Sequence, residues 1–222
     1  MPGAIVTVRH GVTLLGAGET LPQDLAEALA LAPTLVAADG GADTALSAGW
    51  MPRAVIGDFD SLGDAAQLAL PASHLHRVAD QDTTDFQKCL ARIDAPFILA
   101  VGFLGGRLDH TLAAFTALVQ HPEQACFLLG RDDICFLAPR QLSFDPGKGT
   151  RLSLFPMGPV QGESEGLRWP IAGLTFDPGQ RIGTSNVVTG PVRLVFDQRR
   201  MLVILPRHCL RAALQAVVPN RP

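Results

Sequence analysis

Short apolar runs alternate with helical patterns along the first 138 residues of this 222-residue chain, and this alternation constrains the fold more than any other feature. The expected strands are residues 12–18, 34–41, 53–58, 74–80 and 96–102. Between them, residues 22–32, 83–93 and 107–121 carry apolar side chains at three- and four-residue spacing, which is typical of helices. Nearly continuous apolar strands that alternate with helices indicate a mostly parallel sheet covered on both faces. We therefore expect an α/β/α domain at the start of the chain.

The pattern changes after residue 139. Short strands are expected in GTRLSLFPM, AGLTFD, GPVRLVFD and RMLVILP, and turn sequences such as DPGKG and DPGQ separate them. A helical pattern of useful length returns only at residues 208–218. The sequence therefore predicts an α/β domain over residues 1–139, then an all-β, sandwich-like domain over residues 140–222 that ends in a short tail.

Charge and composition exclude several classes of partner. The net charge is −3 and the pI is about 6.0, so the chain lacks the basic surface that nucleic acids require. No apolar stretch approaches the roughly 18 residues of a membrane span, and the start of the chain lacks the features of a signal peptide. The four cysteines show no metal-ligand spacing and lie among apolar neighbours. These features predict reduced thiols in a cytoplasmic protein that binds neither nucleic acid nor membrane.

Acidic residues gather where the predicted strands end. These residues are Asp39, Asp58, Asp60, Asp80, Asp82 and Asp109. The carboxyl ends of parallel strands meet at one edge of the sheet, where ligands of such sheets bind. Carboxylates held together disfavour ionisation unless a positive group lies between them. Mg²⁺ prefers oxygen ligands and is usually shared with substrate phosphates, so the sequence predicts magnesium carrying a polyphosphate.

Each acidic motif also has a purely structural interpretation. Asp60 would cap the helix that follows it, Thr84 and Gln87 fit a capping box, and Asp109 would favour a helix dipole. Capping explains each acid separately, but it does not explain why acids from several strand ends share one edge. The metal interpretation explains the set.

Glycine and tryptophan motifs leave two interpretations open. The GAG sequence with Gly16 and Gly18 is more typical of a tight turn than of a phosphate loop, since it lacks a third glycine and a P-loop lysine. In GFLGGRLDH, Gly105 permits close backbone approach and Arg107 supplies a planar donor. Trp169 would ordinarily belong to the core, but its position near turns also suits a stacking platform. GTSN at residues 183–186 is by itself a turn sequence.

In their order along the chain, ADGGAD, VIGDFDSL, DQDTTDFQKCL, GFLGGRLDH, EGLRWPI and GTSN resemble the motifs of the thiamine pyrophosphokinase family, from Gly16 to Asn186. The resemblance implies an N-terminal nucleotide-binding domain and a C-terminal thiamine-binding β-sandwich. It implies a homodimer whose active sites are shared between subunits. It also implies transfer of pyrophosphate from Mg·ATP to the hydroxyethyl group of thiamine, which gives thiamine diphosphate and AMP.

The resemblance also assigns roles position by position. Catalytic carboxylates are expected at Asp58, Asp60, Asp82 and Asp109, and the first three are expected to bind the metal. Nucleotide and substrate contacts are expected at Gly16, Gly18, Asp39, Gly40, Gln81, Thr84, Asp85, Gly105, Arg107, Trp169, Ser185 and Asn186. The chain departs from the family at Asp43, where asparagine is frequent.

Two other functions agree with parts of the sequence. One is a pyrophosphokinase of another small alcohol, such as a hydroxymethylpterin, and Trp169 with GTSN favours thiamine over it. The other is a nucleotide- or thiamine-binding sensor without catalysis. The full set of strand-end acids favours an enzyme, because a sensor needs less uncompensated negative charge.

Overall fold

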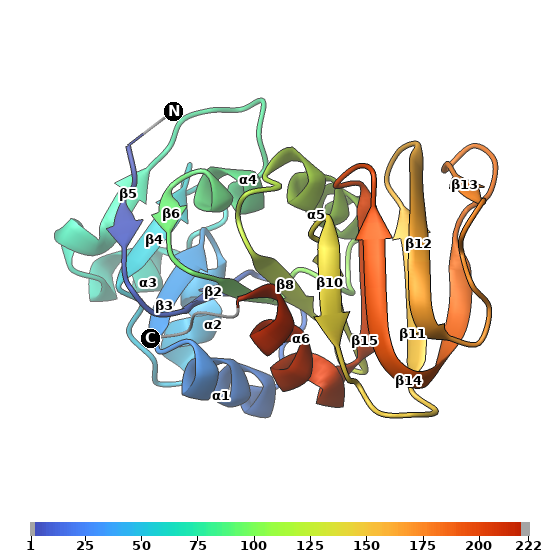
Figure 1. Cartoon of the computed structure of the whole chain (residues 1–222). Helices are drawn as coiled ribbons and strands as arrows, with labels where there is room; N and C mark the ends of the chain where they lie inside the picture. The colour runs from blue at the N-terminus through green and yellow to red at the C-terminus, as the bar shows by residue number, and fades with distance from the viewer. Residues whose placement is uncertain (1–2, 219–222) are drawn as a thin grey trace. The chain divides into compact units, whose positions relative to one another are not determined.

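The chain has a mixed α/β fold, as predicted, and the computed structural model describes residues 3–218 (Figure 1). Its contacts divide the described residues into two compact units, 3–130 and 131–218. The expected domain boundary at residue 139 stays a prediction.

The first unit is built around parallel strands. They are β2 (Val12–Leu15), β3 (Thr34–Ala38), β4 (Ala54–Gly57), β5 (Leu75–Arg77), β7 (Ile98–Val101) and β8 (Cys126–Leu129). Their order is β8-β7-β2-β3-β4-β5, and each neighbouring pair is parallel. Except for β5, every residue of these strands is buried, which explains why Thr13 and Thr34 are the only polar side chains in the other five strands.

The order of these strands reverses between β2 and β7. The chain first adds β3, β4 and β5 on one side of β2, and later adds β7 and β8 on the other side. The loops that follow β2 and β7 are in contact, since the Gly16 and Gly18 amides donate to the carbonyls of Val101 (2.8 Å) and Gly102 (3.0 Å). Open α/β sheets bind their ligands at such a reversal, outside the carboxyl ends of the strands.

Helices connect the parallel strands. They are α1 (Pro22–Leu31), α2 (Gly41–Ser47), α3 (Asp64–Ala69), α4 (Asp85–Leu90) and α5 (Leu108–Gln120), with a 3₁₀ turn η1 at Ala72–His74. The three predicted helices are confirmed as α1, α4 and α5, whereas α2 was not predicted. Two short strands, β1 (Val6–Thr7) and β6 (Ile93–Asp94), form a separate parallel pair.

The second unit is antiparallel. Its strands are β9 (Asp133–Leu137), β10 (Gln141–Phe144), β11 (Arg151–Pro156), β12 (Val160–Leu167), β13 (Thr175–Phe176), β14 (Thr184–Phe196) and β15 (Met201–Pro206). Strand β14 pairs with β11 along residues 184–187 and with β10 along residues 192–195. A strand shared in this way forms a corner between two sheets.

The last helix of the second unit packs against strand β10. After a 3₁₀ turn η2 (Arg207–Cys209), α6 (Leu210–Val217) packs on β10 and buries Leu210, Ala213 and Leu214. The helix predicted at residues 208–218 is therefore confirmed, and it covers apolar surface.

Two absences concern residues 3–218 only. No helix in this range is long and apolar enough to cross a bilayer. Its four cysteines are all buried, and each is a free thiol.

Candidate active site

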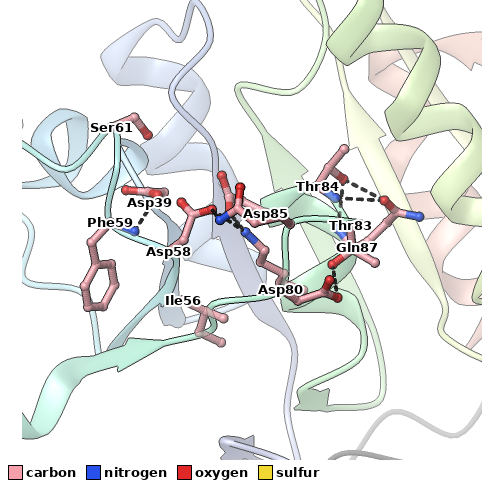
Figure 2. A network of polar contacts seen from close by, with 12 residues as sticks. Asp39, Ile56, Asp58, Phe59, Ser61, Asp80, Thr83, Thr84, Asp85 and Gln87 are labelled. Carbon is pink, nitrogen blue, oxygen red and sulfur yellow. Dashed lines mark hydrogen bonds and ion pairs between the residues drawn. The ribbon is translucent and has the colours of Figure 1, made fainter.

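Three carboxylates meet at the ends of two neighbouring parallel strands. Asp39 follows β3, and Asp58 and Asp60 follow β4. One oxygen from each of the three lies within 4.8 Å of the other two. Figure 2 shows Asp39 beside Asp58, with Asp85 on the far side of Asp58. This acidic cluster therefore has the dimensions of a cation site.

Unusual backbone geometry brings the acidic cluster together. Asp39 (φ 42°) and Phe59 (φ 69°) are the two non-glycine residues with positive φ among those described. The Phe59 amide donates to Asp39 Oδ2 at 3.0 Å, which joins the two turns. A Cβ on Gly57 would lie 2.8 Å from the Asp39 Cβ, so the end of β4 must be glycine for this approach. Strained backbone of this kind is often found at functional sites.

A buried lysine holds one side of the acidic cluster. Lys88 of α4 is 3% exposed, and its Nζ donates to Asp58 Oδ2 (3.0 Å) and Asp85 Oδ1 (2.9 Å). Burial alone would lower the pKa of Lys88, but the two carboxylates outweigh it and the pKa is raised. The Lys88 hydrogen bond holds the pKa of Asp58 at about 2. Gln81 Nε2 also donates to Asp58 Oδ2, at 3.0 Å, so this oxygen is fully engaged.

The other side of the acidic cluster lacks donors. Oδ1 of Asp39 and Oδ1 of Asp58 are buried and have no hydrogen-bond partner within residues 3–218. Asp39 is 1% exposed, and burial, followed by the charge of Asp85, raises the pKa of Asp39 to about 6. Unpartnered buried acceptors are costly, and either a proton or a cation between them would satisfy both. Their hard oxygen donors fit a divalent cation such as Mg²⁺.

The raised pKa of Asp39 makes stability depend on pH. Because the folded value of about 6 lies above the unfolded value, Asp39 contributes stability that is present below about pH 4 and is lost as the pH rises through 6. Asp39→Asn is expected to remove this loss and to raise the free energy of unfolding at pH 7 by about 2–3 kcal/mol without metal. Urea unfolding between pH 4 and 8 measures it. The exposed substitution Asp132→Asn is the control, and an unchanged profile for Asp39→Asn would contradict the prediction.

The loop before α4 contains both a cap and further acids. Thr84 and Gln87 form the predicted capping box, which is confirmed. Asp80 accepts from the Asp82 amide (2.9 Å) and the Thr83 hydroxyl (2.7 Å), and the Thr83 bond helps to lower the pKa of Asp80. Asp82 is exposed and is not one of the three clustered carboxylates. Its assignment as a metal ligand stays a prediction.

Asp109 and Arg107 pair with each other at the start of α5. Arg107 Nη2 lies 2.6 Å from Asp109 Oδ2, and this bond holds the pKa of Asp109 at about 2. Gly105 and Gly106, just before this pair, have φ of 84° and 65°, a conformation that glycine adopts readily. The roles predicted for Gly105, Arg107 and Asp109 stay predictions.

The remaining glycines of the first unit permit close approach. A Cβ on Gly16 or on Gly18 would lie 2.6 Å from the Gly102 carbonyl oxygen. The Gly40 amide donates to Ser61 Oγ at 3.3 Å, which ties the end of β3 to the turn that follows β4. These contacts support the turn interpretation of GAG, and they place the turn at the reversal of strand order.

In the second unit, Trp169 is exposed. Its side chain is 52% accessible, which contradicts the core interpretation, and Arg168 Cζ lies 5.4 Å from the ring centroid. The buried Asn186 amide fixes the Trp169 backbone by donating to its carbonyl (2.7 Å) and accepting from its amide (3.1 Å). Ser185 is exposed on β14 beside Asn186. Trp169 thus has a solvent-exposed indole ring on a backbone that Asn186 holds in place.

Sequence reasoning missed one residue of this site. Lys88 was not selected, although its spacing from Asp85 is that of an ion pair along a helix. The sequence placed Asp39 among the strand-end acids but assigned it a nucleotide or substrate contact and not a metal ligand, whereas the structure groups it with Asp58 and Asp60.

The parallel strands and the acidic cluster outside their carboxyl ends place the first unit in the class of open α/β sheets, which bind their ligands at this edge. Comparisons identify the family. Residues 25–128 match "Thiamin pyrophosphokinase, catalytic domain", and residues 140–200 match "Thiamin pyrophosphokinase, vitamin B1 binding domain". The chain belongs to the thiamine pyrophosphokinase family.

Relatives in plants agree with this assignment. Thiamine pyrophosphokinase 1 of Oryza sativa subsp. japonica is 30% identical over 179 residues, which cover 72% of this chain and 68% of the relative. Thiamine pyrophosphokinase 1 of Arabidopsis thaliana is 29% identical over 161 residues, 63% of this chain and 59% of the relative. The matched region thus leaves about a third or more of each plant protein uncovered.

Solved structures share the fold. The thiamin pyrophosphokinase of Geobacillus thermodenitrificans superposes with a TM-score of 0.69 at 22% identity, covering 88% of this chain and 96% of that one. The yeast thiamin pyrophosphokinase gives a TM-score of 0.72 at 17% identity, covering 89% and 86%.

Proposed function

We propose that the chain transfers pyrophosphate from Mg·ATP to the hydroxyethyl group of thiamine and releases AMP. The observation that carries this proposal is the pair of buried, unpartnered carboxylate oxygens of Asp39 and Asp58 beside Asp60. In a member of this family, that arrangement is best explained by a metal that carries the phosphates of ATP.

Residues of the acidic cluster would hold the cation. Asp39 and Asp58 would each offer Oδ1, and the exposed Asp60 would complete the group. A bound Mg²⁺ would supply positive charge that neutralises the phosphates during transfer. Lys88 keeps Asp58 ionised and fixes its other oxygen, so Asp58 needs no rearrangement to bind.

The chemistry forms a bond from the thiamine hydroxyl oxygen to the β-phosphorus and breaks the bond between that phosphorus and the oxygen that leaves with AMP. The hydroxyl proton must pass to a base. Asp109 is a weak base while Arg107 holds its pKa at about 2. We therefore assign Asp109 to orienting Arg107 toward phosphate, and Asp82 stays a predicted catalytic carboxylate and metal ligand.

Three further parts of the proposal concern the setting of the reaction. Binding of the nucleotide by the first unit is supported by the strand reversal at β2 and β7. A homodimer with shared active sites is supported by the exposed apolar side chains of Phe155 (40%) and Ile182 (63%) in the second unit. A cytoplasmic location agrees with the free thiols of the described cysteines.

The direct test is an assay of purified protein with ATP, Mg²⁺ and thiamine. We expect thiamine diphosphate and AMP in equal amounts, and neither product in EDTA. A hydroxymethylpterin in place of thiamine tests the alternative substrate. Binding of both ligands without any AMP would favour the sensor and overturn the proposal.

Trp169→Ala is expected to weaken thiamine binding at least tenfold and to leave Mg·ATP binding unchanged, because an exposed ring can stack on the cationic substrate. Calorimetric titration of each ligand measures this. Trp50→Ala is the control, since it removes the other tryptophan, which is 45% exposed. If the variant bound neither ligand and its free energy of unfolding fell by roughly 3–5 kcal/mol, Trp169 would instead have a structural role.

A further inference from the structure

A cavity of about 410 Å³ lies in the first unit, between the start of α1 and one face of α2. Thr20, Leu25, Asp43, Thr44, Ser47 and Ala48 are among its lining residues. None of these six was assigned a role in the sequence analysis or in the proposed function.

The lining has an apolar part and a polar part. Leu25 and Ala48 offer apolar surface, whereas Thr44, Ser47 and Asp43 offer two hydroxyls and a carboxylate. Small-molecule sites are typically apolar cavities of a few hundred Å³ or more with a few placed polar groups. This combination suits a flat heteroaromatic ring with polar atoms along its edge.

The carboxylate in this lining is held in place. Asp43 Oδ2 accepts from the Gly63 amide at 3.0 Å, and a Cβ on Gly63 would lie 2.6 Å from Asp43 Oδ1. Asp43 is therefore fixed by main chain from the turn that carries Asp60. A carboxylate oxygen accepts hydrogen bonds, so a ligand that faces Asp43 would present an N–H or O–H donor to it.

The cavity also adjoins the segments that position the acidic cluster. Thr20 lies two residues after Gly18, whose amide bonds to the loop after β7, and a Cβ on Gly102 would lie 2.9 Å from Thr20 Oγ1. On the other wall, α2 begins two residues after Asp39. If the phosphates of a ligand lie at the strand ends, the opposite end of that ligand therefore lies next to this cavity.

We propose that this cavity binds the nucleobase of the nucleotide substrate and that Asp43 accepts a hydrogen bond from the exocyclic amino group of adenine. The inference rests on the proposed function, because it takes the bound nucleotide from that reaction. Asp43 makes the site selective, since hypoxanthine presents a carbonyl oxygen where adenine presents the amino group. Two acceptors facing each other repel, whereas a hydrogen bond to a charged group is favourable.

The test compares Mg·ATP with Mg·ITP, by calorimetric titration and by the rate of AMP or IMP release. We expect the wild-type protein to favour ATP by about 10- to 100-fold. Asp43→Asn should reduce this preference at least tenfold, because an amide can donate to the carbonyl of ITP and can still accept from Gly63. Asp64→Asn, an exposed acid on α3, is the control and should keep the preference.

A second variant tests the cavity independently of Asp43. Ala48→Phe should fill the cavity and weaken the binding of ATP and of ITP about equally, with thiamine binding unchanged. A wild-type preference for ATP that survives in Asp43→Asn, together with unchanged ATP affinity in Ala48→Phe and unchanged melting temperatures, would overturn the cavity assignment while AMP release still supports the proposed function. Absence of AMP release from the wild-type protein would overturn the proposed function itself, and the base assignment with it.

Discussion

Replacing Lys88 with methionine is expected to lower the free energy of unfolding by about 3–5 kcal/mol, because it leaves Asp58 and Asp85 without their shared cation. Methionine fills similar volume, so the loss reports charge and not a cavity. Urea unfolding at pH 7 measures the effect. Adding Asp58→Asn and Asp85→Asn to the same chain is expected to recover part of the loss, since no buried charge then stays unpaired.

The matched control for Lys88 is Arg193, which pairs with Glu165 at 3.1 Å on the surface of the second unit. The side chains of Arg193 and Glu165 are each about half exposed or more, so solvent and salt screen this ion pair. Arg193→Met should leave the unfolding midpoint almost unchanged. A similarly small effect for Lys88→Met would show that water reaches the Lys88 pair and would contradict the prediction.

Asp60→Asn is expected to reduce turnover by about 10²- to 10³-fold, because it removes a charged ligand from the proposed cation site. The melting temperature without metal should stay the same or rise, since like-charge repulsion in the acidic cluster falls. Single-turnover rates beside thermal melts measure both, and Mn²⁺ titration reports binding of the cation directly. The predicted cap role of Asp60 is wrong, because the N-cap of α3 is Gly63 and no side chain caps this helix. Turnover that persists in Asp60→Asn would therefore contradict the cation-site assignment.

The same variant tests the proposed dimer. Mixing Asp60→Asn chains with Trp169→Ala chains creates, in a shared-site heterodimer, one site with both changes and one with neither. Activity should therefore return on mixing. Heterodimers that form without regaining activity would show that each site is built within one chain.

The sequence predicted those parts of the site that depend on local pattern. Asp58 and Asp60 follow an apolar run, and a strand that ends in acids places them at an edge whatever else the chain does. Trp169 could not be settled in this way, because its exposure depends on how the end of β12 is held by Asn186, 17 residues further along the chain.

Other parts depend on contacts between distant segments and were beyond pattern reasoning. Lys88 resembles an ordinary surface lysine on a helix until Asp58, 30 residues earlier, is brought against it. The N-cap of helix α2 and its first residue are both glycines, Gly40 and Gly41, and a glycine pair usually marks a turn. Gly41 is required because a Cβ there would lie 2.2 Å from the Leu15 carbonyl oxygen. Strand β12 was missed because GESEG is rich in charge, and its two glutamates, Glu163 and Glu165, are exposed to solvent.

The reversal of strand order between β2 and β7 determines how much of the chain must be synthesised before the sheet edge beside Gly16 can form. Residues 12–15 and 98–101 must pair to form the centre of the sheet, so a long intervening segment has to be ordered or looped out first. Strands β2 to β5 can pair in sequence as they leave the ribosome, but the edge beside Gly16 stays open until β7 arrives. Pairing across such a separation slows folding. The proposed nucleotide site is therefore expected to be among the last parts of the first unit to assemble. A nascent chain that stops before residue 101 would present an unpaired β2 edge to chaperones.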